Sequence, residues 1–99
     1  MITRDRACKL FLEHNKNMII TFSIEYGPFI IVQAVYKNHI NDDYYIKNIV
    51  SPYYMINKET KEIDEFNPIF DLKGFRDAIK KSAIIYNQKV LDTLGWKIK

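Results

Sequence analysis

The apolar residues of the chain change their spacing at Met18, and this change constrains the fold more than any other feature. Over residues 4–15 they recur at positions i, i+3, i+4 and i+7, which is the spacing of one helix face. Over residues 18–26 they recur at every second position, as in a strand with one buried side. The sequence therefore predicts a helix followed by a strand, and the rest of the chain must complete a sheet on which the helix can pack.

The predicted helix over residues 4–15 has a capping residue at its start. Thr3 is a suitable N-cap, and Asp5 lies near the positive end of the helix dipole. The inward face is formed by Ala7, Leu10, Phe11 and His14. We therefore expect His14 to be a core or boundary histidine and Cys8 to be a small, half-buried residue of the same helix.

Two long strands joined by Gly27-Pro28 are expected next. The first strand has Ile20, Phe22, Ile24 and Tyr26 on one face. The second strand, over residues 29–37, has Ile30, Val32, Ala34 and Tyr36 on its expected inner face. Its other face carries Phe29, Ile31 and Val35, which is unusually apolar for a solvent-facing side. We expect this outer face to be partly covered.

The middle of the chain predicts a further strand and a hairpin. Residues 44–50, YYIKNIV, follow the polar turn NHINDD and have the composition of a strand, which Pro52 interrupts. Residues 53–57 and 62–66 are expected to pair. The KETK segment between them lacks the Asn-Gly or Asp-Gly of a two-residue turn, so it predicts a four- or five-residue loop.

One long helix is predicted to close the chain. Asp71 is a suitable N-cap, and Gly95 is a suitable left-handed stop. Between them the near-helical spacing is carried by Leu72, Phe75, Ile79, Ser82 or Ala83, Tyr86 and Val90. Gly74 weakens this helix by up to about 1 kcal/mol relative to Ala, which a long apolar face can absorb. Trp96 begins a tail that is able to fold back.

The order of these elements predicts a single α+β domain over residues 1–99. We expect an N-terminal helix, an antiparallel sheet of four or five strands in a meander, and a C-terminal helix packed on the sheet. Short consecutive connections favour the meander, and the layer rule places the helices on one face.

The chain carries no run of about 20 apolar residues, so no membrane-spanning helix is expected. Charges interrupt the N-terminal MITRDRACKLFLEH, which therefore lacks the apolar core of a signal peptide. A single cysteine cannot form an internal disulfide, which fits a reducing compartment. These features predict a cytoplasmic protein.

No catalytic or metal-binding pattern stands out in the sequence. Cys8, His14 and His39 are far apart along the chain, and nothing places a third group to orient a base. Adjacent carboxylates such as Asp64 and Glu65 point to opposite faces of a strand. The glycines are isolated, so no phosphate-binding loop is present. We therefore expect a protein without enzyme activity, cofactor or metal.

Charge is distributed unevenly along a chain whose net charge is +3. The basic residues gather at the ends, as Arg4, Arg6, Lys9, Lys80, Lys81, Lys89, Lys97 and Lys99. The acidic residues concentrate in the middle, close to tyrosines, which bring a large contact area at low entropy cost. Carboxylates there would speed docking of a basic partner. The candidate partner-binding residues are Asp42, Asp43, Tyr44, Tyr45, Glu59, Glu62, Asp64 and Glu65. A solvated turn is the alternative interpretation of the hairpin charges.

The layout resembles small bacterial immunity proteins with a helix, sheet, helix order. The likeness is carried by the N-terminal MITRDRA, the strand–NKETKEI–strand hairpin and the closing FNPIFDLKGFRDAI. The resemblance implies a non-enzymatic, cytoplasmic protein that binds one cognate interbacterial toxin, as in contact-dependent inhibition systems. Such a toxin is often a nuclease, and the inhibitor blocks its active site. Many of these inhibitors are acidic, whereas this chain is net basic and its acidic residues only concentrate in the middle.

Two other hypotheses remain open from the sequence. The aromatic residues and the basic termini would also suit a small nucleic-acid-binding or phage-encoded inhibitory protein, because bases stack on aromatic rings and phosphates pair with lysines. The apolar outer face of the strand over residues 29–37 would also suit a structural subunit that buries it in a homodimer.

Overall fold

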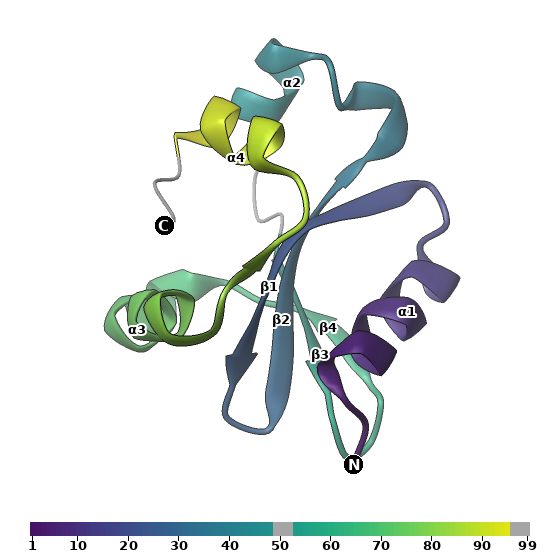
Figure 1. Cartoon of the computed structure of the whole chain (residues 1–99), viewed down its shortest axis with the longest axis vertical. Coiled ribbons are helices and arrows are strands. Elements are labelled where there is room, and N and C mark those ends of the chain that lie inside the picture. Colours follow the sequence, from purple (N-terminus) through teal and green to yellow (C-terminus); the bar gives the residue numbers. More distant parts are fainter. Residues whose placement is uncertain (49–52, 96–99) are drawn as a thin grey trace.

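The computed structural model describes residues 1–48 and 53–95, which form an antiparallel sheet with helices on both sides (Figure 1). Its elements, in chain order, are α1 (Arg4–His14), β1 (Met18–Tyr26), β2 (Phe29–Tyr36), the 3-10 turn η1 (Lys37–His39), α2 (Asp43–Lys47), β3 (Tyr53–Asn57), β4 (Ile63–Glu65), the 3-10 turn η2 (Pro68–Asp71), α3 (Leu72–Ser82), β5 (Ile84–Ile85) and α4 (Gln88–Leu94). The predicted α+β class is confirmed.

The strands lie in the order β4-β3-β2-β1-β5, and every neighbouring pair is antiparallel. The four strands β1 to β4 follow one another as the predicted meander. Strand β5 joins at the other end of the order, beside β1, and pairs only with Phe22 and Ser23. The sheet therefore has a hairpin at one edge and a two-residue strand at the other.

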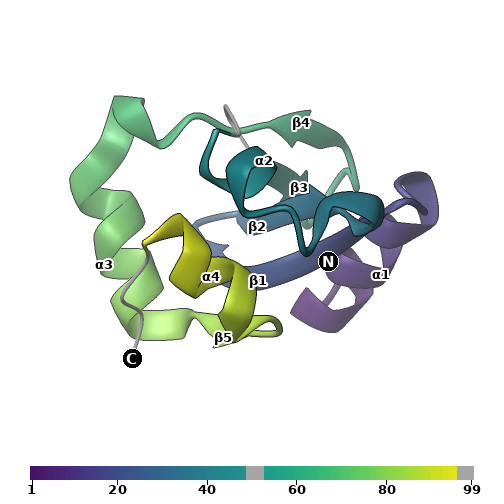
Figure 2. The ribbon, with the colours of Figure 1, turned by 90° about the horizontal axis from the view of Figure 1, so that it is seen from above.

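The helices cover both faces of the sheet, so the expectation of helices on a single face is wrong (Figure 2). On one face, α1 contributes Ala7 and Phe11 to a buried cluster. On the other face, α3 and α4 contribute Phe75 and Leu91 to a second cluster. The apolar outer face of β2 explains this arrangement, because its side chains must also be buried away from water and a second helical layer packs on them. Ile31, on that face, is fully buried within the chain, so the homodimer hypothesis for this face is wrong.

A β-bulge in β1 sends its apolar residues to two faces. The register with β2 shifts between Ile20 and Phe22, which leaves Thr21 as an extra residue. Ile20 packs in the cluster under α1, whereas Phe22 packs in the cluster under α3. The buried Thr21 hydroxyl donates to Oε1 of the equally buried Gln33 at 2.6 Å. The prediction that Ile20 and Phe22 share one face is therefore wrong.

The segment predicted as a strand over residues 44–50 instead begins as the helix α2. Asp42 caps it, because its side chain accepts a hydrogen bond from the backbone N–H of Tyr45 at 3.0 Å. Ile46 is buried against Val35 and Val90 in a third apolar cluster. The end of the segment lies outside the described residues, as does Pro52.

The predicted long C-terminal helix is interrupted after Ser82. Ala83 adopts an extended conformation, and Ile84 and Ile85 pair with β1 in place of continuing the helix. Asn87 then caps α4 by accepting a hydrogen bond from the N–H of Val90. Gly95 has a φ of +83° and ends α4 in the left-handed conformation, as predicted. Trp96 and its tail lie outside the described residues.

Several local predictions are confirmed. Thr3 caps α1 by accepting a hydrogen bond from the N–H of Arg6, and Asp71 caps α3 through the N–H of Gly74. Strands β3 and β4 form the predicted hairpin, in which Asn57 N–H donates to the carbonyl of Glu62 across a four-residue loop. No helix among residues 1–48 and 53–95 is both long and apolar enough to cross a bilayer.

Candidate functional site

The β3–β4 hairpin carries half of the predicted partner-binding residues. Glu59, Glu62, Asp64 and Glu65 are all exposed, and β4 is the outermost strand of the sheet. The loop is shaped by its own side chains, since Asn57 Oδ1 accepts hydrogen bonds from two successive backbone N–H groups. This local bonding fixes the loop and leaves its carboxylates directed to the surface. We call these four carboxylates the acidic edge.

The lysine that precedes the acidic edge does not neutralise it. Lys58 Nζ lies 3.1 Å from Glu25 Oε1, and its side chain is only 17% exposed. Glu25 also approaches Arg4 Nε at 3.6 Å, so Lys58 is held in a small network beneath the loop. In the described parts of the chain, no acidic-edge carboxylate has an ion-pair partner. The acidic edge therefore presents charges that a partner can still pair.

The other half of the predicted set lies on α2. Tyr44 is 79% exposed, and Asp43 is also exposed in the first turn. Asp42 serves as the helix cap and lies 3.9 Å from His39 Nδ1. The ring of Tyr45 stacks on His39 with centroids 4.0 Å apart. Two of these four residues thus have structural roles, while Asp43 and Tyr44 are free to contact a partner.

The structure does not gather the eight predicted residues into one patch. Figure 1 shows α2 at one end of the molecule and the β3–β4 loop at the other. Tyr54 lies near a member of each group, because it pairs with Glu65 across the hairpin and is also close to Tyr45 of α2. The pKa of Tyr54 is raised, mainly by burial and to a lesser extent by the nearby Tyr36, Glu65 and Tyr45. Glu65 is thus the acidic-edge residue nearest to α2, and a partner that also contacts Glu59 in the loop would have to span the length of β3.

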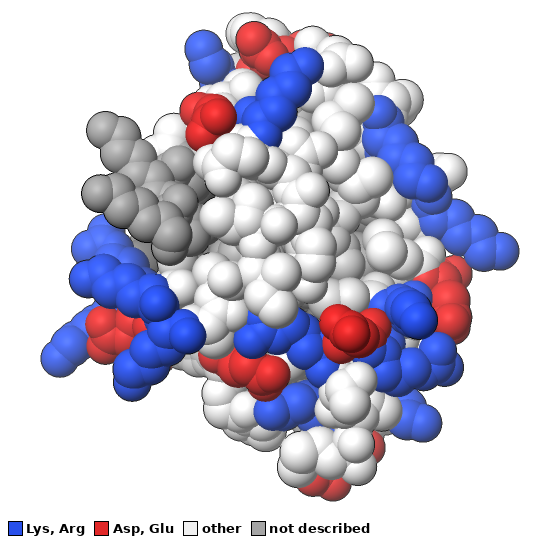
Figure 3. All heavy atoms as spheres, in the orientation of Figure 1, with Lys and Arg blue, Asp and Glu red and all other residues white. Residues whose placement is uncertain are grey.

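The basic residues of the N-terminus are largely engaged within the chain. Arg4 donates to the carbonyls of Ser82 and Ser23, and Arg6 lies 3.4 Å from Glu13. On the face seen in Figure 3, an uncharged centre is surrounded by basic side chains interspersed with acidic ones. Lys97 and Lys99 lie outside the described residues. No continuous basic surface for a nucleic acid is visible on that face.

The groups with catalytic potential are separated or suppressed. Cys8 is half-buried, as predicted, and burial raises the pKa of its thiol, although hydrogen bonding to Tyr86 and Ser23 acts in the opposite direction. His14 is exposed and bonds to the carbonyl of Leu10, so its predicted inward placement is wrong. Residues 1–48 and 53–95 contain no group of three His, Cys, Asp or Glu side chains that could hold a metal ion.

The structure also reveals two surface features that sequence reasoning missed. A groove of about 630 Å³ lies between α1 and β1, lined by Leu12, Met18 and Ile20 among others. The turn η2 exposes Ile69 and Phe70, the latter 89% exposed. The groove forms only where α1 approaches β1, and Ile69 and Phe70 lie between the elements that the sequence predicts.

No family model, curated protein or solved structure matches the chain. We therefore infer its function from the side chains themselves.

Proposed function

We propose that the protein is a non-enzymatic binding module that neutralises a bacterial protein toxin, and that the acidic edge is its main contact. The observation that carries this proposal is the set of four exposed carboxylates without ion-pair partners on the outermost strand β4 and the loop that precedes it, in a chain whose net charge is +3. The order of elements also agrees with the resemblance to immunity proteins. Such a protein would act in the cytoplasm, where the toxin reaches its target.

The chemistry of the acidic edge favours a basic surface on the partner. Carboxylates at the rim of an interface steer a basic partner and raise its association rate, while a buried pair adds hydrogen bonds from Arg or Lys. The active sites and substrate grooves of nucleases are basic because they hold phosphates, so a nuclease toxin fits this surface. Asp43 and Tyr44 would reach only a partner that extends toward α2.

Charge reversal on the hairpin tests the proposal. A panel of basic bacterial toxin domains, including any encoded beside this gene, would be titrated with the wild-type protein and with the double variant Glu62→Lys, Asp64→Lys. We expect the variant to lose affinity by at least about tenfold, because like charges then face each other across the interface. The matched control is Glu13→Lys with Asp77→Lys, which changes net charge equally at exposed sites on α1 and α3.

Two results would contradict the proposal. One is equal affinity of the hairpin variant and wild type for the toxin, which would remove the acidic edge from the interface. The other is tight binding of the wild-type protein to bulk nucleic acid that weakens steeply with salt, since that is the signature of phosphate contacts.

A further inference from the structure

The groove between α1 and β1 has an apolar floor. Its volume is about 630 Å³, and Leu12 and Cys8 from α1 face Met18 and Ile20 from β1 across it. This volume lies within the range of about 300–1,000 Å³ typical of ligand pockets. It opens beside β1, at the opposite end of the strand order from the acidic edge.

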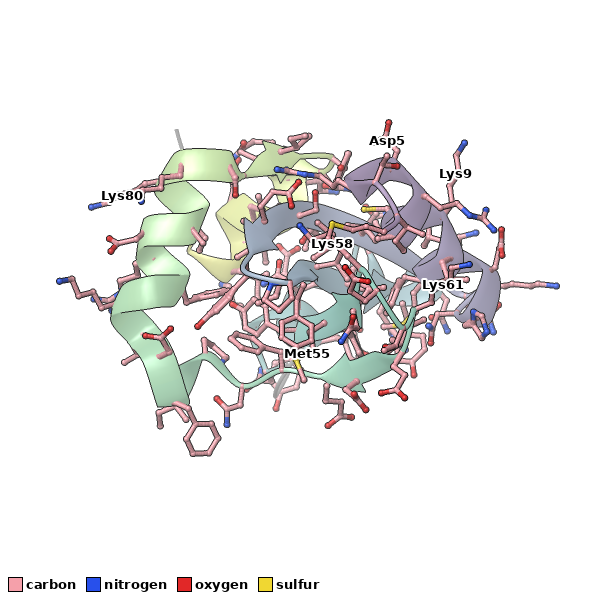
Figure 4. The ribbon with its side chains drawn as sticks, turned by 90° about the horizontal axis from the view of Figure 1, so that it is seen from below. Asp5, Lys9, Met55, Lys58, Lys61 and Lys80 are labelled. Carbon is pink, nitrogen blue, oxygen red and sulfur yellow. The ribbon has the colours of Figure 1, made fainter. Side chains whose placement is uncertain are left out.

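The rim of the groove is positively charged. Lys9, Lys16 and Lys37 line it, and all three are exposed, whereas Asp5 is the one carboxylate among its lining residues. Figure 4 shows Asp5 and Lys9 projecting from α1, on the side away from α3. None of the three lysines forms an ion pair within the described residues. An anionic ligand would find unpaired cations around an apolar floor.

One wall of the groove is an open strand edge. Strand β5 pairs only with Phe22 and Ser23, so it stops short of residues 18–20. Lys37 N–H donates to the carbonyl of Asn17, which therefore points toward β2. By antiparallel alternation, the peptide groups of Met18 and Ile20 point the other way, toward this edge. The N–H of Met18 donates to the carbonyl of Asn15, and outside the strand ladders the N–H and C=O of Ile20 form no hydrogen bond with the described backbone.

We propose that the groove binds an extended acidic segment of a partner protein, which pairs with β1 at residues 18–20 in line with β5. The open peptide groups select a peptide over an acyl chain, because a ligand without hydrogen-bonding groups would bury them unsatisfied, at a cost of about 1–3 kcal/mol each. Alternating side chains of the segment would reach the apolar floor and the lysine rim in turn. This surface is separate from the acidic edge and takes a partner of opposite charge.

Cys8 provides a direct reporter for this site. It is the only cysteine in the chain and it lines the groove, so its alkylation rate measures groove occupancy. The probe is a six-residue peptide in which Asp or Glu alternates with Val or Ile. We expect this peptide to slow the alkylation of Cys8 by about tenfold or more when saturating, because a bound ligand covers a thiol that is already half-buried.

Matched variants and peptides separate this proposal from non-specific attraction. Lys9→Glu with Lys16→Glu should weaken binding of the peptide, measured by fluorescence anisotropy, by about tenfold or more. Lys80→Glu with Lys81→Glu makes the same charge change on α3, where Lys80 projects from the other side of the molecule, and should leave binding unchanged (Figure 4). A peptide with alternate backbone nitrogens methylated should lose binding, since it cannot pair with the strand.

Several outcomes would overturn the proposal. Equal protection of Cys8 by a peptide with Lys in place of the acidic residues would remove the role of the rim. Equal loss in both lysine variants, or undiminished binding of the methylated peptide, would remove the groove or the strand edge. If light scattering shows self-association that Glu62→Lys with Asp64→Lys abolishes, the occupant is a second copy of this chain. Because the peptide assay uses no toxin, its failure leaves the test of the acidic edge unaffected.

Discussion

Arg4 should contribute more to stability than the other arginine of the first helix. Its side chain is 14% exposed, and its guanidinium donates to the carbonyl of Ser82 at 2.5 Å and that of Ser23 at 3.4 Å. It therefore joins the start of α1 to the end of α3 and to β1. Replacing Arg4 with Ala removes these bonds and leaves the two half-buried or buried carbonyls to find other partners.

The size of the effect follows from these contacts. A hydrogen bond from a charged donor contributes about 1.5–3 kcal/mol, and the longer bond to Ser23 adds less. The ion pair with Glu25 adds at most about 1 kcal/mol, because Glu25 is 44% exposed and solvent screens it. Lys58 continues to neutralise Glu25 in the variant. We therefore expect Arg4→Ala to lower the free energy of unfolding by about 2–3 kcal/mol.

Urea unfolding followed by circular dichroism measures this change. With a urea dependence of about 1–1.5 kcal/mol per molar, the midpoint should fall by about 2 M. The matched control is Arg6→Ala, since Arg6 lies on the same turn but pairs only with exposed Glu13 and should cost less than about 0.5 kcal/mol. Equal losses in the two variants would refute the assignment of Arg4 as the link between α1 and α3.

Three smaller predictions concern Asp71 and the hairpin loop. The hydrogen bond that Tyr26 donates to Asp71 raises the pKa of Tyr26 to about 12, so the stability that the bond adds is fully present below pH 10 and is lost as the pH rises through 12. Asp71→Asn should lower the pKa of Tyr26 toward its ordinary value, as measured by an ultraviolet absorbance titration. An unchanged titration would contradict the assignment of the raised pKa to the Asp71 carboxylate. Gly74→Ala would normally stabilise a helix by about 1 kcal/mol, yet should lower the melting temperature, because the added Cβ would overlap the Asp71 carboxylate; a higher melting temperature would count against the overlap. Lys61 has a φ of +66°, so Lys61→Gly should raise the free energy of unfolding by up to about 1 kcal/mol, and a loss of stability in urea would contradict this.

The elements that were predictable from sequence are those whose signals agree over a long stretch. Helix α1 has a capping residue and about three turns of consistent apolar spacing, and β1 and β2 have long apolar runs around Gly27-Pro28. The hairpin was predictable because both of its strands and its loop are contiguous in sequence. In each case local preference and tertiary packing favour the same structure, so the local sequence is enough to predict the element that forms in the fold.

The elements that were mispredicted are short and depend on distant partners. The residues of α2 are as compatible with a strand as with a helix, and the cap at Asp42 together with burial of Ile46 decides between them. Ile84 and Ile85 lie within the segment predicted as helix, yet they complete the sheet by pairing with Ser23 and Phe22 of β1. Short apolar segments carry too little local information to reveal such long-range pairing.

The two candidate surfaces, the acidic edge and the groove, also differ in how far they could be predicted from the sequence. The acidic edge could be predicted as a candidate because its four carboxylates fall within seven residues of sequence, from Glu59 to Glu65. That Lys58 is turned toward Glu25, and so leaves these carboxylates unpaired, requires the fold. The groove could not be predicted, because it forms only where α1 approaches β1 and where β5 ends. Its lysines, Lys9, Lys16 and Lys37, carry no shared signal in the sequence.

The β-bulge at Thr21 accounts for both the two-faced sheet and the open edge. Strict alternation would place Ile20 and Phe22 on one face, and one of the two helical layers would then lose its contact with β1. Because of the inserted residue, β1 directs Ile20 toward the layer that contains α1 and Phe22 toward the layer that contains α3. It also directs the Thr21 carbonyl outward, where it accepts the N–H groups of Tyr86 and Asn87 and turns the chain from β5 into α4. Strand β5 consequently ends before residues 18–20, so the open wall of the groove is a direct consequence of the bulge.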